Sequence, residues 1–66
     1  MNENALKAQL VRKGYTYETI SKEIGISKNA LWKKITGKND FKLPEIQKLK
    51  SILNLSEDDF NEIFFN

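Results

Sequence analysis

Hydrophobic residues recur along the chain at the three- and four-residue spacing of amphipathic helices, and no stretch alternates between apolar and polar residues as a strand does. Five groups follow this spacing, so the pattern predicts an all-α fold with five helices. Their members are Leu6, Leu10 and Val11; Ile20 and Ile24; Ala30, Leu31 and Ile35; Ile46, Leu49, Ile52 and Leu53; and Phe60, Ile63 and Phe64. We expect the second helix at about 17–24 and the third at about 28–36.

The segments between these helices share a pattern. Residues 14–16, 25–27 and 54–56 read GYT, GIS and NLS, so each places a residue that tolerates left-handed backbone before an apolar residue and a hydroxyl side chain. The first residue can end one helix and the hydroxyl can cap the next, while the apolar residue packs four residues beyond the cap as a hydrophobic staple. The second and third helices are therefore expected to form a helix-turn-helix. Gly37 should end the third helix, and Pro44 fits the first turn of the fourth.

Length and composition exclude several classes of function. The chain has 66 residues, which we expect to form one domain (1–66), and it contains no cysteine and no histidine. Disulfides, the usual zinc ligand sets and nucleophiles activated by histidine are therefore absent. We expect no catalytic site, no metal, no cofactor and no small-molecule ligand. The start of the chain lacks a signal pattern and no apolar run reaches about 20 residues, so we expect a cytoplasmic protein that does not enter a membrane.

The distribution of charge is more informative than the net charge of +2. Residues 1–50 hold all 11 basic residues and five acidic ones, a balance of +6, whereas residues 51–66 hold four acidic residues and no basic one, a balance of −4. Residues 27–42 contain five lysines and one aspartate. Such a basic patch is typical of a surface that meets a polyanion, although a solvated helix face has the same composition.

A helical projection of the third helix separates these lysines from the core. Ala30, Leu31 and Ile35 turn toward the core, with Lys34 beside them as an edge residue. The opposite face carries Lys28, Asn29, Trp32, Lys33 and Thr36. Lysine can donate to guanine or to phosphate, asparagine can pair with adenine, and an apolar ring can touch a thymine methyl group. This face therefore suits duplex DNA.

Residues 16–37, TYETISKEIGISKNALWKKITG, resemble the helix-turn-helix of the phage lambda repressor and Cro superfamily, the Xre-like family. The following FKLPEIQKLKSIL and LSEDDFNEIFF are similar to the fourth and fifth helices of that family. The resemblance implies a compact five-helix lambda-repressor-like domain. It also implies a sequence-specific, double-stranded DNA-binding transcriptional regulator of phage or prophage type, a Cro-like repressor in the nucleoid of a bacterial host.

The resemblance also assigns roles to residues. The expected base contacts are Lys28, Asn29 and Lys33, with Trp32 adjacent. The expected phosphate contacts are Thr16, Tyr17, Ser27, Thr36, Lys38 and Asn39. As an alternative, Trp32 lies against Lys28 or Thr36 as a surface residue, while Thr36 and Asn39 only end the helix.

The sequence departs from the family pattern in three ways. Tyr17 stands where the family commonly has glutamine, and Ser21 replaces the small alanine at the helix crossing, where we expect its hydroxyl to bond within its own helix. Lys34 and Ile35 replace a frequent tryptophan and glutamate pair. These departures favour a phage-type branch of the family.

The carboxyl-terminal residues raise the question of self-association. We expect Glu57, Asp58 and Asp59 to stabilise the start of the fifth helix after the cap at residue 56, with Asp59 forming a capping box. Phe64 and Phe65 are candidate dimer contacts, since Phe65 falls outside the apolar stripe.

A weak homodimer that strengthens on DNA would match an operator with an inverted repeat. In the alternative arrangement, Phe65 folds against Leu6 or Leu10 and completes a monomeric core.

A second class of function uses the same fold. A helix-turn-helix can serve as a protein-interaction module, of the antitoxin or antirepressor type, with the aromatic carboxyl terminus as its contact. The basic patch argues against this alternative, whereas Trp32 and Phe65 favour it. An enzyme is the weakest option, because a helical chain this short lacks a phosphate-binding glycine loop and a recognised catalytic constellation.

Overall fold

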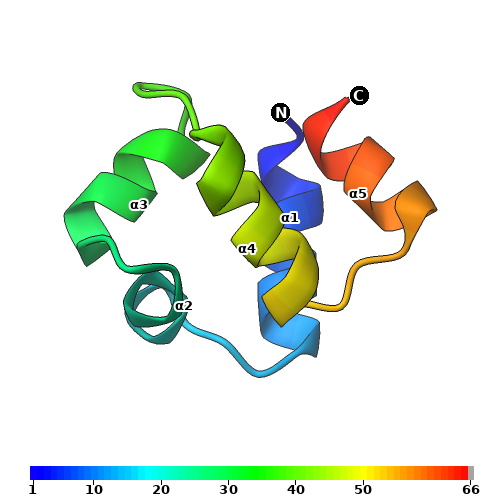
Figure 1. Cartoon of the computed structure of the whole chain (residues 1–66), viewed down its shortest axis with the longest axis horizontal. Coiled ribbons are helices and arrows are strands. Elements are labelled where there is room, and N and C mark those ends of the chain that lie inside the picture. Colours follow the sequence, from blue (N-terminus) through cyan, green and yellow to red (C-terminus); the bar gives the residue numbers. More distant parts are fainter. Residues whose placement is uncertain (66) are drawn as a thin grey trace.

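The computed structural model describes residues 1–65, which form five α-helices and contain no strand. This confirms the all-α class (Figure 1). The helices are α1 (Glu3–Arg12), α2 (Tyr17–Ile24), α3 (Lys28–Ile35), α4 (Leu43–Ile52) and α5 (Glu57–Phe64). The range of α2 is the expected one, while α3 ends one residue early because Thr36 is its C-cap. No helix within the described range is long and apolar enough to cross a bilayer.

The helices place α3 and α5 at opposite ends of the molecule, with α4 between them (Figure 1). In the packing between helices, α2 lies against α3 and α4, and α1 lies against α5. The backbone amide of Asn2 donates to the carbonyl of Ile63 at 2.7 Å, so the start of the chain is tied to the last helix. This arrangement leaves the outer face of α3 uncovered.

Every helix contributes to the core, which consists of Leu6, Leu10, Ile20, Ile24, Leu31, Ile35, Leu49, Leu53, Leu55 and Ile63. The prediction that Val11 belongs to the apolar, core-facing side of the first helix is wrong, because its side chain is 79% exposed. In α1 the buried side is formed by Leu6, Gln9 and Leu10 at spacings of three and four, and Val11 lies one step around the helix from that stripe. The side chain of Gln9 takes the inner position instead.

The turn between α2 and α3 is fixed from both sides. Gly25 adopts a left-handed φ of 85°, and the amide of Ile26 then donates to the carbonyl of Ser21 at 3.0 Å. The hydroxyl of Ser27 accepts from the amide of Ala30 at 3.0 Å and caps α3. Ile26 packs against the core between these two bonds. The orientation of α3 relative to α2 is therefore set within three residues.

The junctions at residues 14–16 and 54–56 follow the same pattern as the junction at residues 25–27. Thr16 and Ser56 accept from the amides of Thr19 and Asp59, both at 3.1 Å, and Asn54 takes a positive φ of 50°. The predicted capping box at α5 is wrong, because within residues 1–65 the Asp59 carboxylate makes no hydrogen bond to the Ser56 amide. A capping box does form at α2, where the Thr16 amide donates to the Thr19 hydroxyl at 2.9 Å.

Two further local predictions are confirmed. The hydroxyl of Ser21, a buried residue of α2, donates to the carbonyl of Glu18 in its own helix at 2.8 Å. Pro44 lies in the first turn of α4, where its missing N–H costs no helical hydrogen bond. Both residues are thus accommodated without an unpaired buried polar group.

Candidate nucleic-acid interface

The outer face of α3 carries the four residues that the sequence predicts as base contacts. Lys28, Asn29, Trp32 and Lys33 are all exposed, whereas Leu31 and Ile35 on the opposite face are buried. The exposed residues occur in adjacent pairs separated by one turn, so they form one surface, here called the α3 surface. The structure therefore brings together these four predicted residues on an uncovered face.

The polar side chains of the α3 surface have no polar partners among the described residues. Within residues 1–65, the side chains of Lys28, Asn29 and Lys33 form no ion pair and no side-chain hydrogen bond. Lys28 and Asn29 lie in the first turn of the helix, at the end that carries its positive partial charge. These donors and the amide acceptor of Asn29 are free to meet an external polar ligand.

Two of the predicted phosphate contacts are helix N-caps. Thr16 precedes α2 and Ser27 precedes α3, and each uses its hydroxyl oxygen as an acceptor for a backbone amide of the first turn. The Ser27 hydroxyl keeps its own proton for a further acceptor, whereas the Thr16 hydroxyl also lies 3.2 Å from the Thr19 hydroxyl. Tyr17, which follows Thr16, is half-buried and packs against the core. The start of α2 and the start of α3 thus present hydroxyl groups beside positive helix ends, a combination suited to an anion.

The remaining predicted phosphate contacts, Thr36, Lys38 and Asn39, follow α3. The hydroxyl of Thr36 donates to the carbonyl of Trp32 at 2.8 Å, so this side chain helps to end the helix, as the alternative interpretation has it. The amides of Lys38 and Asn39 donate to the carbonyl of Lys33 at 2.8 and 3.1 Å. Lys38 and Asn39 are exposed and lie at the carboxyl end of the α3 surface.

Lys34 lies in a different environment from the other lysines of the basic patch, residues 27–42. Its ammonium lies 2.6 Å from the Glu45 carboxylate, and the two side chains are only 11% and 12% exposed. Lys34 lies at the edge of the core, as predicted, but its ammonium is paired with a carboxylate inside the fold. The pairing of Lys34 with Glu45 was not predicted from the sequence. Lys42, the last of the five lysines in residues 27–42, is exposed and is the N-cap of α4.

The protonation of Glu45 reflects this environment. Burial opposes ionisation of the carboxylate, but hydrogen bonds from Lys34 and from the Lys42 amide outweigh it, and nearby positive charge adds to them. The pKa of Glu45 is therefore lowered. The Glu45 carboxylate is thus ionised at neutral pH, and its contact with Lys34 connects α3 with α4.

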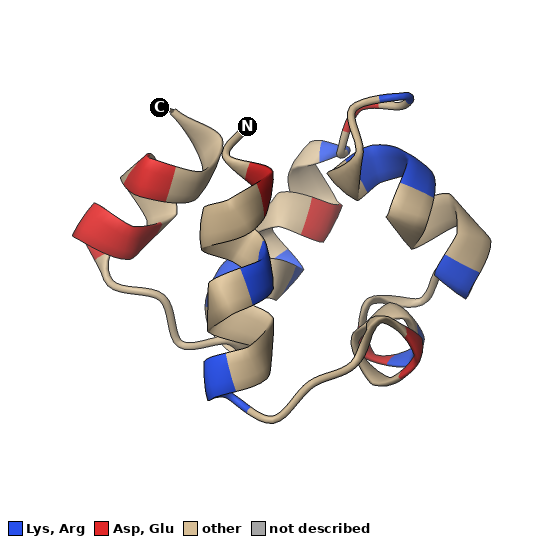
Figure 2. Cartoon of the chain, turned by 180° about the vertical axis from the view of Figure 1, so that it is seen from behind, with Lys and Arg blue, Asp and Glu red and all other residues tan. Residues whose placement is uncertain are grey.

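Charge is separated along the molecule, with lysines on α3 and the following loop and acidic residues on α5 (Figure 2). The acidic residues of α5 are Glu57, Asp58, Asp59 and Glu62. Of these, Glu57 is paired with Lys50 at 2.7 Å. The α3 surface is thus the positive end of the molecule and α5 is the negative end.

The candidate dimer contacts occupy different environments. Phe64 is half-buried and its ring lies 6.1 Å from that of Phe41 in an edge-on arrangement, whereas Phe65 is 75% exposed and lies 5.7 Å from Phe60. The alternative in which Phe65 folds against Leu6 or Leu10 is therefore wrong. Phe65 is an exposed aromatic residue beside the acidic helix.

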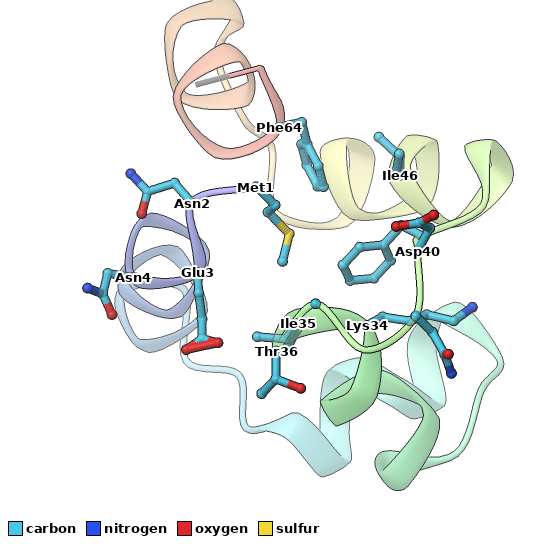
Figure 3. A pocket seen from close by; sticks show the side chains of 13 residues that line it. Met1, Asn2, Glu3, Asn4, Lys34, Ile35, Thr36, Asp40, Ile46 and Phe64 are labelled. Carbon is cyan, nitrogen blue, oxygen red and sulfur yellow. The ribbon is translucent and has the colours of Figure 1, made fainter.

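An open hollow of about 580 Å³ lies between the start of α1, the end of α3 and the end of α5 (Figure 3). Met1, Phe41 and Phe64 supply its apolar wall, and Glu3 and Asp40 lie at its margin. Within the described residues, histidine, cysteine and acidic side chains form no group of three or more that could hold a metal ion. The hollow therefore combines an apolar wall with the carboxylates of Glu3 and Asp40.

Comparison of the chain with protein-family models, with curated proteins and with solved structures finds no significant match. The geometry of the α3 surface is therefore the main indication of function.

Proposed function

We propose that the protein is a sequence-specific, double-stranded DNA-binding transcriptional regulator, with α2 and α3 acting as a lambda-repressor-like helix-turn-helix. The observation that carries this proposal is the α3 surface, where Lys28, Asn29 and Lys33 project from one uncovered face and have no internal polar partners. An α-helix fits the major groove of B-DNA, and docked helices of this type use their first turns to meet base edges. The first turn of α3 carries two of these three residues.

In the proposed complex, base contacts and phosphate contacts have separate roles. Asn29 can pair through two hydrogen bonds with adenine, and Lys28 and Lys33 can donate to guanine or to phosphate. Thr16 and Ser27 meet the sugar-phosphate backbone at the starts of α2 and α3, and Lys38 meets it beyond the end of α3. Phosphate contacts fix the register of the helix, and the base contacts then select the sequence.

Charge separation supports the same docking direction. The negative α5 lies at the end of the molecule away from α3, so a polyanion attracts one end and repels the other (Figures 1 and 2). This asymmetry favours encounters in which the α3 surface faces the duplex. The regulator then acts by occupancy, in the manner of a small Cro-like repressor.

The proposal includes self-association of two copies of the chain through Phe65. Phe65 follows the end of α5 and is 75% exposed, so it can join two copies while the outer faces of both α3 helices remain free. A two-fold arrangement of copies matches an inverted repeat with half-sites about one helical turn apart. The association is weak in solution and strengthens when both copies are held on one duplex.

Selection from a pool of random duplexes tests the function directly. The native protein is titrated against the pool at low and at moderate salt, and the bound fraction is sequenced. Enrichment of an inverted repeat supports specific readout by a dimer, whereas binding without enrichment at either salt concentration would rule out sequence recognition. Asn29→Ala is the test variant, and Asn61→Ala, an exposed asparagine on α5, is its matched control.

The exposure of Phe65 also favours a second function, that of a protein-interaction module of the antitoxin or antirepressor type. That module would bind its partner through the aromatic residue at the end of α5 and would not need the lysines of α3. Absence of binding to any duplex at low salt, together with retained folding, would favour this second function over the first.

A further inference from the structure

Trp32 lies beneath a lysine of the loop that follows α3. The ammonium nitrogen of Lys38 is 4.9 Å from the centroid of the indole ring, within the range of a cation–π interaction. Trp32 is 41% exposed and Lys38 is exposed. The contact therefore lies at the solvent-facing surface, at the carboxyl end of the α3 surface, where a duplex in the proposed complex would pass.

The backbone holds Lys38 in place for this contact. Gly37 takes a left-handed φ of 85°, which turns the chain back over the helix end. The amides of Lys38 and Asn39 then converge on the carbonyl of Lys33, at 2.8 and 3.1 Å. The Lys38 backbone is thus fixed relative to α3, and the indole ring restricts the remaining freedom of its long side chain.

We propose that Trp32 is a positioning residue that holds the Lys38 ammonium toward a backbone phosphate of duplex DNA, and that Trp32 does not read a base. This inference rests on the proposed function and specifies how its phosphate contact is built. An ammonium group has three N–H donors, so attraction to the ring on one side leaves donors for phosphate oxygens on the other. Within residues 1–65, the Lys38 ammonium forms no ion pair, although Asp40 lies in the same loop.

The position of Trp32 agrees with this role. Lys28 and Asn29, the residues best placed for base edges, lie one turn earlier in α3. A base or a thymine methyl group stacked on the indole face that Lys38 covers would have to displace the ammonium. Retaining the ammonium and adding a phosphate needs no such displacement.

A double-mutant cycle on the native background tests the inference. Affinities of Trp32→Leu, Lys38→Met and the double variant are measured on a selected duplex and on a random duplex. The loss of one exposed cation–π contact corresponds to about a two- to fivefold weaker affinity. We expect Trp32→Leu to weaken both duplexes by this factor, and to have no further effect once Lys38 is methionine. Trp32→Phe, which keeps an aromatic face, should restore affinity to within about twofold of the native protein.

A second measurement follows the contact in the free protein. Side-chain methylene protons of Lys38 should show an upfield ring-current shift by nuclear magnetic resonance, retained in Trp32→Phe and lost in Trp32→Leu. Backbone amide chemical shifts away from the substituted residues, compared with those of the native protein, show whether each variant is folded. Lys13→Met, an exposed lysine at the end of α1, is the matched control for loss of a charge.

The possible outcomes separate the two proposals. If the native protein binds no duplex, the proposed function and this inference both fail. If it binds but Trp32→Leu still weakens binding in the Lys38→Met background, or changes the selected sequence, then Trp32 contacts DNA directly and the inference alone fails. An increase in affinity on Trp32→Leu would mean that the ring withholds Lys38 from DNA, and would also overturn it.

Discussion

The ammonium of Lys34 lies 2.6 Å from both carboxylate oxygens of Glu45, and this ion pair joins the last turn of α3 to the first turn of α4. The same carboxylate accepts from the Lys42 amide at 2.9 Å. One side chain therefore fixes the end of the proposed recognition helix and the end of the loop that carries Lys38. Both partners are nearly buried, so their contribution differs from that of a surface pair.

Removing one partner of this pair should destabilise the fold. Lys34→Ala leaves the Glu45 carboxylate in a poorly hydrated position, and we expect the free energy of unfolding to fall by about 1–3 kcal/mol. Urea denaturation followed by circular dichroism measures this change. Lys33→Ala is the matched control, since that lysine is exposed, and it should change stability by less than about 0.5 kcal/mol.

Replacing both partners should cost less than replacing one. Lys34→Met with Glu45→Leu removes both charges and retains side-chain volume, which is often neutral for buried pairs. A double variant as unstable as the sum of the two single variants would show that the two groups do not interact.

The lowered pKa of Glu45 predicts how stability depends on pH. The unfolded chain binds the Glu45 proton at a higher pH than the folded chain does, so this stabilising contribution is complete above about pH 4.5, the ordinary value. It is lost as the pH falls through the lower pKa of the folded state. Unfolding free energies of the native protein and Glu45→Gln should therefore converge on acidification. A constant difference between them down to pH 2 would contradict the assignment.

Asn29 should determine one position of the DNA site. We expect Asn29→Ala to weaken binding to the selected duplex by about 1–3 kcal/mol and to relax the preference at one base pair, because a bidentate contact to adenine is lost. Competition binding against duplexes with single base-pair changes measures this effect. Asn61→Ala on α5 should leave both affinity and preference unchanged. An unaltered preference in Asn29→Ala would remove Asn29 from the set of base-reading residues.

Lys38 should contribute to affinity without contributing to sequence preference. Lys38→Ala loses one phosphate contact, so it should weaken all duplexes alike and reduce the slope of log affinity against log salt by about 0.9. Titrations over a range of salt concentrations provide this slope. Lys13→Ala, which removes a lysine distant from α3 in the sequence, should keep the native slope; equal slopes for the two variants would argue against a phosphate contact at Lys38.

Phe65 should govern self-association. Phe65→Ser is expected to leave the fold intact, because the side chain is 75% exposed, and to abolish cooperative binding to a duplex with two half-sites. Affinity for a single half-site should remain that of the native protein. Analytical ultracentrifugation of both proteins on the two duplexes distinguishes these effects, and unchanged cooperativity would remove Phe65 from the contact between copies.

Local signals in the sequence predicted the helices well. The GIS and NLS junctions depend on left-handed backbone and on hydroxyl caps, which act within a few residues, so the start of α3 at Lys28 and the positive φ of Asn54 follow from the sequence. The separation of Leu31 and Ile35 from Lys28, Asn29 and Lys33 follows from helical period alone. The exposed side of α3 was therefore predictable.

Contacts between elements were not predictable in the same way. Lys34 and Glu45 are 11 residues apart on two helices, and no periodic pattern relates them. Trp32 meets Lys38 because the loop after Gly37 turns back over the helix end. The exposure of Val11 depends on where α1 meets its neighbours, since its residue type alone favours burial. These relationships are fixed by tertiary packing, which overrides local preference.

The four connections differ in their tolerance of changes in chain length. Residues 14–16, 25–27 and 54–56 end one helix and cap the next within three residues, so an added residue there would break both ends at once. The connection between α3 and α4, residues 36–42, is longer and is exposed at 37–40. Related chains that differ in length should therefore carry their insertions and deletions in this loop. The same loop is the place where a label or an added peptide would least disturb the remaining helices.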